Sequence, residues 1–211
     1  TLGAVGCLMH RYDWVLSPFL IKLADDDPFF ICYTSGTTGD PKGAVLTHRS
    51  WFYASMVRAL QGGINRNDRI LLPFPLAFTG GLALSMVALW SGATLVLEPA
   101  FEPGRALQLI ESQRITVFMA VPTLFQLMAQ HPDFASTDIS SIRCASSGGA
   151  TVPVSLLQIY LDRGITMTQT YSLTEVSASG ITLPYHEAFA RVGSCGIPAM
   201  HSQARIVDAD D

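Results

Sequence analysis

Short apolar runs and longer runs of helical length alternate along most of this chain. The runs of strand length cover residues 69–72, 93–97, 116–120, 142–145 and 165–168. The runs of helical length lie between them, at residues 82–90, 103–113, 122–130 and 153–162. Strands that alternate with helices predict an α/β fold, with a mostly parallel sheet covered by helices on both faces. Such a sheet binds ligands at the carboxyl ends of its strands.

The N-terminal part departs from this alternation. Residues 29–32 and 44–46 are apolar runs on either side of a polar loop, and they predict two strands. Residues 47–60 predict a helix, with Thr47 as its N-cap and glycine at its end. His48, in the first turn, is interpreted as a solvated or capping side chain rather than a ligand.

The loop between the two strands has a composition suited to a polyanion. Its sequence from Tyr33 to Gly43 is YTSGTTGDPKG, with four hydroxyl residues, three glycines and Lys42. Glycine lets backbone N–H groups converge, and hydroxyl and ammonium groups supply further donors, so phosphate is the expected ligand. The spacing differs from the G-x-x-x-x-G-K-[ST] phosphate loop. A flexible turn without a ligand is the alternative.

The composition indicates a chain with an unusually large apolar content. Hydrophobic residues are 49% of the 211 residues and charged residues only 14%, against about 25% charged residues in typical soluble domains. We therefore expect a piece of a larger protein whose other parts cover apolar surface, and self-association of the chain alone. The formal net charge of −4 gives no basic surface for nucleic acid.

The cysteines and the longest uncharged stretch bear on location. Cys7, Cys32, Cys144 and Cys195 are dispersed, without a C-x-x-C pair, which favours reduced thiols and a cytoplasmic protein. No secretory leader pattern opens the chain. Residues 71–97 carry no charge and have the length of a membrane span. Prolines and glycines divide them into strand, loop, helix and strand, so no membrane span is expected.

The loop from Tyr33 to Gly43 resembles the signature loop of the AMP-forming acyl-adenylate family. This family includes acyl-CoA synthetases, peptide-synthetase adenylation domains and luciferases. The resemblance implies that the loop holds the β- and γ-phosphates of ATP while a carboxylate attacks the α-phosphate. The residues that it assigns to ATP are Thr34, Ser35, Gly36, Thr37, Thr38, Gly39 and Lys42, of which Lys42 is also an expected catalytic residue.

Two further stretches resemble the family's adenine motifs. Residues 146–150 are similar to its adenine-binding turn, which implies nucleotide contacts from Gly148, Gly149 and Ala150. Residues 169–175, QTYSLTE, are similar to its adenine and magnesium motif. The nucleotide-binding residues that this second motif implies are Gln169, Thr170, Tyr171 beside the adenine, and Thr174 on the α-phosphate.

Glu175 is the implied magnesium ligand, and it is an expected catalytic residue together with Thr174. A carboxylate-held magnesium ion and a placed hydroxyl stabilise the negative charge that gathers at the α-phosphate. Taken alone, Glu175 also fits an exposed glutamate in the first turn of a helix.

Residues 75–81 resemble the family's acyl-pocket motif. The implied substrate-pocket residues are Phe78, Thr79, Gly80 and Ser172. Many acyl-CoA synthetases carry histidine at the position of Phe78, and the family usually carries glycine at the position of Ser172. Phe78 fits either a gate of an apolar acyl pocket or a buried core residue.

The resemblance implies one AMP-binding core within the large domain of an adenylate-forming enzyme. Residues 1–28 are expected to be the remnant of an upstream subdomain, and residues 29–211 the nucleotide-binding core. Residues 193–198 and 204–207 resemble the stretch beyond the adenine motif. The family's ribose-binding aspartate, its hinge and its C-terminal lid with the catalytic lysine are expected to have no counterpart within these 211 residues.

The implied activity is that of an acyl-CoA synthetase. The full-length protein would activate a carboxylic acid, of the fatty or another acyl class, to acyl-AMP with release of pyrophosphate, and then transfer it to CoA. ATP, Mg²⁺ and CoA are the implied cofactors, and the chain alone is expected to be inactive. A peptide-synthetase-type adenylation domain and a non-catalytic nucleotide-binding module are the alternatives.

Overall fold

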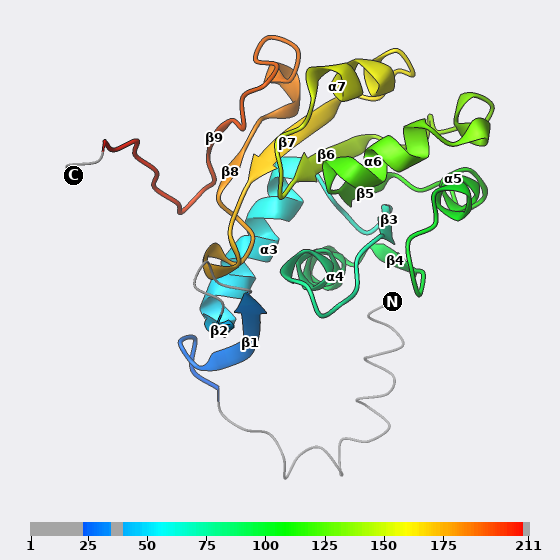
Figure 1. The fold of residues 1–211 in the computed structure, drawn as a ribbon. Coiled ribbons are helices and arrows are strands. Elements are labelled where there is room, and N and C mark those ends of the chain that lie inside the picture. Colours follow the sequence, from blue (N-terminus) through cyan, green and yellow to red (C-terminus); the bar gives the residue numbers. More distant parts are fainter. Residues whose placement is uncertain (1–22, 35–39, 209–211) are drawn as a thin grey trace, which may run out of the picture.

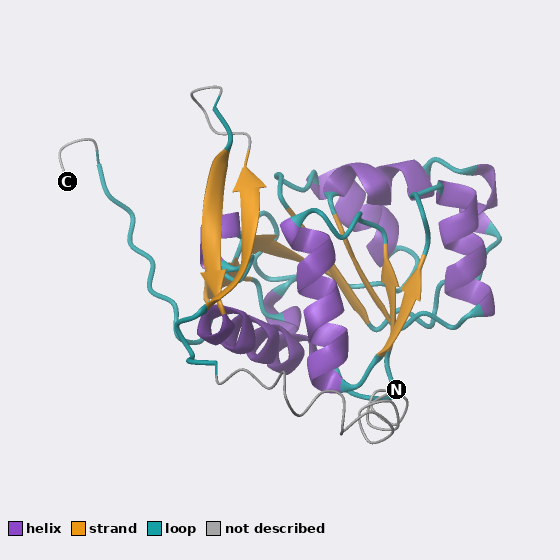
Figure 2. Ribbon diagram, turned by 90° about the horizontal axis from the view of Figure 1, so that it is seen from below, coloured by secondary structure: helices purple, strands orange, loops and turns teal. Residues whose placement is uncertain are grey.

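The computed structural model describes residues 23–34 and 40–208 (Figure 1). An antiparallel hairpin of β1 (Pro28–Thr34) and β2 (Lys42–Thr47) comes first. It stands beside a seven-stranded sheet rather than within it (Figure 2). In chain order, the strands of the larger sheet are β3 (Arg69–Leu72), β4 (Thr94–Leu97), β5 (Val117–Ala120), β6 (Cys144–Gly148), β7 (Met167–Tyr171), β8 (Ile181–Thr182) and β9 (Ile197–Pro198).

The larger sheet is mostly parallel, as predicted. Its spatial order is β4-β3-β5-β6-β7-β8-β9. The first five strands are parallel to their neighbours, and β8 and β9 join antiparallel at the β7 edge. The carboxyl ends of β6 and β7 therefore lie side by side, which is where the sequence placed the adenine motifs.

Both faces of the sheet are apolar because its central strands are buried on both sides. Leu71, Phe118 and Ala145 belong to one core cluster, and Ile70 and Val117 to the other. Successive strand residues point to opposite faces, so each strand contributes to both clusters.

Helices cover each of these faces, and the predicted fold class is confirmed. The helices on the first face are α5 (Pro103–Ser112), α6 (Pro122–Ala129) and α7 (Val154–Leu161). Those on the second face are α3 (His48–Gly62) and α4 (Thr79–Ser91). Three short 3₁₀ turns complete the described elements: η2 (Pro132–Ala135), η3 (Thr174–Val176) and η4 (Tyr185–Glu187).

The helix after the hairpin has the predicted ends. Thr47 and Ser50 form a reciprocal capping box at the start of α3, and Gly63 ends it in the left-handed conformation, with φ of 57°. Because α3 starts immediately after β2, the hairpin is tied to the second face of the sheet.

Three predicted boundaries, all near the motifs, differ from the structure by three residues, and the others differ by two or fewer. Helix α4 begins at Thr79, three residues before the predicted start, because Gly80 and Gly81 belong to its first turn. A Cβ on Gly81 would lie 2.3 Å from the carbonyl oxygen of Pro75, so the close packing of this turn requires glycine. Strands β6 and β7 each run three residues further than predicted, because polar residues continue their ladder.

Residues 71–97 form β3, a loop, α4 and β4 rather than one long helix. In the part of the chain that the structure describes, no helix is long and apolar enough to cross a membrane. Cys32, Cys144 and Cys195 are free thiols.

A half-buried ion pair, with its carboxylate buried, joins the amino ends of three parallel strands. Asp68 precedes β3 and is 3% exposed, and its carboxylate accepts bonds from the Arg143 guanidinium, one of them at 2.9 Å. Thr116 Oγ1 donates to Asp68 at 2.7 Å and the Asn65 N–H at 2.9 Å. Desolvation raises the pKa of Asp68, but these hydrogen bonds outweigh it and hold the pKa below its usual value.

Candidate functional site

The predicted adenine turn lies at the carboxyl end of β6, next to β7. Gly148, the last residue of β6, pairs with Thr170 in β7. A Cβ on Gly148 would lie 2.7 Å from the carbonyl oxygen of Thr170, so only glycine allows this spacing. Gly149 follows with φ of 82°, and Ala150 is exposed. The turn therefore presents backbone, without side-chain bulk, at the carboxyl edge of the sheet.

The last three residues of β7 differ in their hydrogen bonds and in their exposure. Thr170 Oγ1 lies 3.1 Å from Ser146 Oγ, a hydroxyl contact between β6 and β7. Gln169 is buried, and its amide nitrogen donates to the carbonyl oxygen of Ser194 at 3.3 Å. Tyr171 ends the strand with 54% of its surface exposed, so its ring has a free face. Of the three, Tyr171 is the one that an aromatic base can stack on.

The turn that carries Thr174 and Glu175 is short and strained. η3 has only three residues, and the preceding Leu173 makes no side-chain cap. Ser177 and Ala178 follow it, each with φ of 54°, a left-handed conformation that is unfavourable for residues other than glycine. The Glu175 carboxylate is exposed and makes no hydrogen bond or ion pair with any described residue. A full helix that would favour a first-turn glutamate is absent here, so the helix-dipole explanation loses its basis.

Thr79 brings three of the predicted motifs together. Its Oγ1 lies 2.9 Å from Oγ1 of Thr174 and 3.0 Å from Sγ of Cys32. Thr79 belongs to the first turn of α4. Thr174 lies in η3, 95 positions away in sequence, and Cys32 lies in β1, 47 positions away. The acyl-pocket motif, the magnesium motif and the strand that leads into the phosphate loop therefore meet at one point.

The two strands that flank the phosphate loop both contact this part of the structure, β1 through Cys32 and β2 through η3. Thr34 and Lys42 are paired in the hairpin, where Thr34 Oγ1 donates to the carbonyl oxygen of Lys42 at 3.4 Å. β2, which begins at Lys42, packs against η3. The Lys42 ammonium is exposed and has no partner among the described residues. Ser35, Gly36, Thr37, Thr38 and Gly39 lie outside the described residues.

The predicted acyl-pocket residues flank the Thr79–Thr174 contact. Phe78 is the N-cap residue of α4 and is 65% exposed, so it is not a core residue in this structure. Gly80 lies in the first turn of α4, with the Phe74 ring 3.5 Å from where its Cβ would stand. Ser172 is half-buried and directly follows β7.

Two residues beside the site were missed by the sequence analysis. Cys32 is buried in β1 and was considered only as a free thiol. Arg58 lies in the middle of α3, and its Nη2 donates to the carbonyl oxygen of Ser177 at 3.0 Å. Burial lowers the pKa of Arg58 to about 10, and its Nη1 is buried without a partner in the described part of the chain. A basic residue amid the apolar positions of a helix is the signal that could have identified Arg58.

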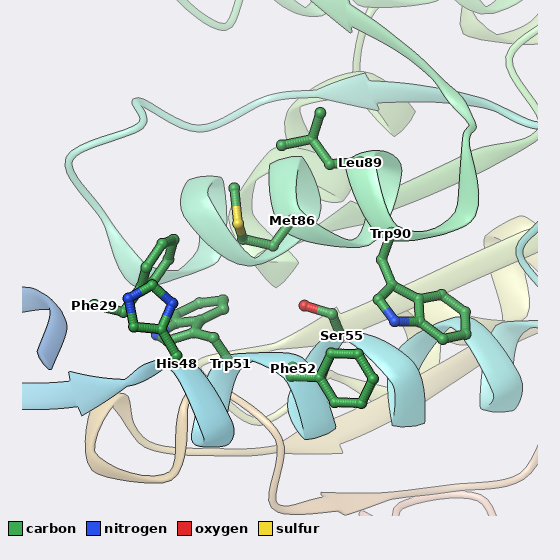
Figure 3. A pocket seen from close by; sticks show the side chains of 8 residues that line it. All are labelled: Phe29, His48, Trp51, Phe52, Ser55, Met86, Leu89 and Trp90. Atoms are coloured by element: carbon green, nitrogen blue, oxygen red, sulfur yellow. The ribbon is translucent and has the colours of Figure 1, made fainter. Parts of the chain in front are cut away.

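An apolar groove lies elsewhere, between the outer sides of α3 and α4 (Figure 3). It has a volume of about 310 Å³ and is lined by Phe29, His48, Trp51, Phe52, Ser55, Met86, Leu89 and Trp90. None of the predicted site residues lines it. His48 packs edge-on against Phe29, with 4.9 Å between the ring centres, and the cap of α3 is formed by Thr47 and Ser50 rather than by His48.

The chemistry of the donor set fits a magnesium nucleotide better than a metal held by protein alone. No group of three His, Cys, Asp or Glu residues in the described segments is arranged to hold a metal ion. Mg²⁺ needs no such group, because it is usually bound by one or two carboxylates together with substrate phosphates and water. Glu175 is a carboxylate without a partner among the described residues, and it lies in η3 beside Thr174, where β2 packs against the turn.

Comparison with known proteins shows the family to which the chain belongs. The profile of the family described as AMP-binding enzyme matches residues 11–211, and the chain belongs to this family. Feruloyl-CoA synthase from an Amycolatopsis species is 36% identical over 182 residues, which are 86% of this chain and 37% of that protein.

Solved structures show the same fold. A fatty acyl CoA synthetase from Mycobacterium tuberculosis matches with a TM-score of 0.80 and 34% identity, over 86% of this chain and 36% of that chain. O-succinylbenzoate coenzyme A synthetase (MenE) from Bacillus subtilis, in complex with ATP and magnesium ion, matches with a TM-score of 0.76 and 30% identity, over 85% of this chain and 38% of that chain. The chain thus spans little more than a third of the length of these relatives.

Proposed function

We propose that the full-length protein containing this chain is an AMP-forming acid–thiol ligase. It activates a carboxylic acid with ATP to acyl-AMP and pyrophosphate, and then passes the acyl group to CoA. The observation that carries the proposal is the meeting of Cys32, Thr79 and Thr174, which joins the phosphate-loop strand, the acyl motif and the magnesium motif at one corner. The three relatives described above are all named for CoA ligation.

In the first half-reaction, a carboxylate oxygen forms a bond to the α-phosphorus and the bond to the bridging oxygen of the β-phosphate breaks. The Thr174 hydroxyl donates to an oxygen of the α-phosphate as negative charge gathers there. Lys42 and the loop residues Thr34–Gly39 hold the β- and γ-phosphates. They therefore offset part of the negative charge that develops on the leaving pyrophosphate.

Glu175 would hold a magnesium ion, which would supply positive charge to the phosphate oxygens. Its carboxylate is suited to this role because it is exposed and unpaired among the described residues. The adenine lies against the backbone of the turn at Gly148 and Gly149, and the exposed Tyr171 side chain covers the base. Phe78, Thr79, Gly80 and Ser172 border the acyl group.

The substrate is proposed as a fatty or aromatic acid. The relatives are named for feruloyl, fatty acyl and succinylbenzoate groups, which share a carboxylate on an apolar or aromatic body. The exposed Phe78 at the start of α4 is an apolar surface suited to such a body. The free thiols Cys32, Cys144 and Cys195 fit the proposed cytoplasmic location.

The rest of the full-length protein has a defined part in this proposal. Residues 29–211 form the nucleotide-binding core, and residues 1–28 belong to an upstream subdomain. Segments outside this chain supply the ribose contact and the lid that closes over the α-phosphate. The chain alone is therefore expected to be inactive, because both positioning and exclusion of water depend on closure.

The test is ATP–pyrophosphate exchange by the full-length protein with a panel of acids. The panel contains ferulate, fatty acids of several lengths, succinylbenzoate and amino acids, with a control that lacks acid. We expect exchange that depends on an aromatic or fatty acid, and a CoA thioester once CoA is added. Exchange with amino acids alone would favour a peptide-synthetase-type domain. Binding of ATP without exchange for any acid would refute the ligase and favour a nucleotide-binding module.

A further inference from the structure

Cys32, Thr79 and Thr174 form a chain of polar side chains that ends at the candidate α-phosphate site. Sγ of Cys32 is 3.0 Å from Oγ1 of Thr79, which is 2.9 Å from Oγ1 of Thr174. Cys32 is 7% exposed, and both threonines are half-buried. This series of side-chain contacts therefore runs from the buried Cys32 in β1 outward to η3.

The direction of these hydrogen bonds follows from proton counting. A threonine hydroxyl has one proton to donate and two lone pairs that accept. A phosphate oxygen without a proton can only accept, so Thr174 must donate its proton to a bound phosphate. Thr174 can then only accept from Thr79, and Thr79 can only accept from the Cys32 thiol. An anion at Thr174 thus selects a single arrangement, in which each bond polarises the next.

We propose that Thr79 is a positioning residue for Thr174, with Cys32 as the terminal donor of the chain. This inference rests on the proposed function, because it assigns Thr79 an action in the adenylation step through Thr174. Thr79 donates its proton to the Thr174 oxygen, so the Thr174 proton points at the α-phosphate.

The turn that carries Thr174 needs such support. η3 is three residues long, and no side chain caps it. The strained residues Ser177 and Ala178 follow it. The hydroxyl of Thr79 comes from a more rigid element, since the first turn of α4 packs directly on the backbone of Pro75 at Gly81. Arg58 holds the other end of the turn through the carbonyl oxygen of Ser177.

The test compares two substitutions of Thr79 in the full-length protein. Thr79→Val removes the hydroxyl and keeps the branched shape, and Thr79→Ser keeps the hydroxyl. The assay is acid-dependent ATP–pyrophosphate exchange, with kcat and KM for ATP and for the acid. We expect Thr79→Val to lower kcat about tenfold, the scale of one lost hydrogen bond. The KM for the acid should stay within about twofold of wild type, because the group lost acts on the reaction step. Thr79→Ser should restore most of the rate.

A double-mutant comparison separates positioning from a direct role in the acyl pocket. In a Thr174→Ala background, Thr79→Val should cause no further loss, because the group through which it acts is gone. Cys32→Ala should lower kcat less than Thr79→Val does, by about two- to threefold, because a thiol is a weak donor.

The outcomes that would overturn the inference are distinct. An equal loss from Thr79→Val with and without the Thr174 hydroxyl, or a changed acid preference in both backgrounds, would show that Thr79 acts directly on the acyl group and not through Thr174. A lower Tm with unchanged kcat would make it a packing residue. If the Thr79→Val variant catalyses exchange at the wild-type rate, this inference is overturned and the proposed function stands. An absence of exchange by the unmodified protein with every acid would remove the proposed function, and this inference with it.

Discussion

Replacing Arg143 with methionine should destabilise the fold strongly at neutral pH. The substitution keeps an unbranched side chain of similar length and removes the guanidinium. That guanidinium pairs with Asp68 and also donates to the carbonyl oxygens of Gly62 and Gly63, at 2.9 and 3.0 Å, where α3 ends. Loss of Arg143 therefore leaves a buried carboxylate without its counter-charge and helix carbonyls without their donors.

The magnitude follows from how much each partner is buried. Removing one partner of a fully buried pair costs about 3–5 kcal/mol. The Asp68 side chain is 3% exposed, but that of Arg143 is 42% exposed, and Asp68 keeps its hydrogen bonds from Thr116 and Asn65. Solvent screening and these remaining bonds reduce the expected loss to about 2–3 kcal/mol in the free energy of unfolding.

The loss should shrink as the pH falls. In the wild-type protein the pKa of Asp68 is lowered, so its stabilising contribution is present above the unfolded pKa and is lost as the pH falls through the folded pKa. In the Arg143→Met variant, fewer hydrogen bonds oppose the effect of burial, so the pKa of Asp68 is higher than in the wild-type protein. The protonated form of Asp68 is then favoured in the folded variant. The difference in the free energy of unfolding between the variant and the wild-type protein therefore becomes smaller as the pH falls from neutral toward about 4.

The assay is urea unfolding followed by tryptophan fluorescence, to which the buried Trp51 contributes, and by circular dichroism, at pH 7.5 and 4.5 and at one protein concentration. Arg49→Ala is the matched control, because Arg49 pairs with Asp25 and Asp26 at 3.6 and 3.1 Å on the exposed surface. The control should change the free energy of unfolding by less than about 1 kcal/mol. A loss in Arg143→Met no larger than that of the control, or one that grows at pH 4.5, would refute the reasoning.

Four further predictions concern the candidate site and the isolated chain. Glu175→Gln should lower magnesium-dependent acyl-AMP formation by the full-length protein about 100-fold without lowering Tm, because the metal supplies several kcal/mol; near-normal rates at limiting Mg²⁺ would remove the metal role. Lys42→Ala should raise the KM for ATP about tenfold, the scale of one charge-assisted hydrogen bond, and an unchanged KM and rate would contradict it. Phe78→Ala should shift the preference between acids that differ by one methylene by about 1–3 kcal/mol; an unaltered acid profile with a lower Tm would make Phe78 a packing residue. The 211-residue chain alone should self-associate in light scattering through exposed apolar side chains such as Phe52 and Leu89, and a stable monomer would show that this surface tolerates water.

The sequence alone determined the architecture because the signals for it are local. Alternating apolar runs predict a mostly parallel sheet, and Thr47 and Gly63 mark the ends of α3 through their own hydrogen-bonding and backbone preferences. The family motifs could also be found in sequence, because each is a short run of consecutive residues. The roles of Lys42 and Glu175 within them stay predictions.

Only the tertiary structure decided how the motifs meet. The strands β6 and β7 end in Gly148 and Tyr171, beyond their apolar runs, because backbone pairing continues through polar residues. The contact between Thr79 and Thr174 spans 95 residues, and that between Arg58 and Ser177 spans 119. No local pattern encodes such contacts, since they arise when helices α3 and α4 pack on the same face of the sheet and bring their side chains to one turn.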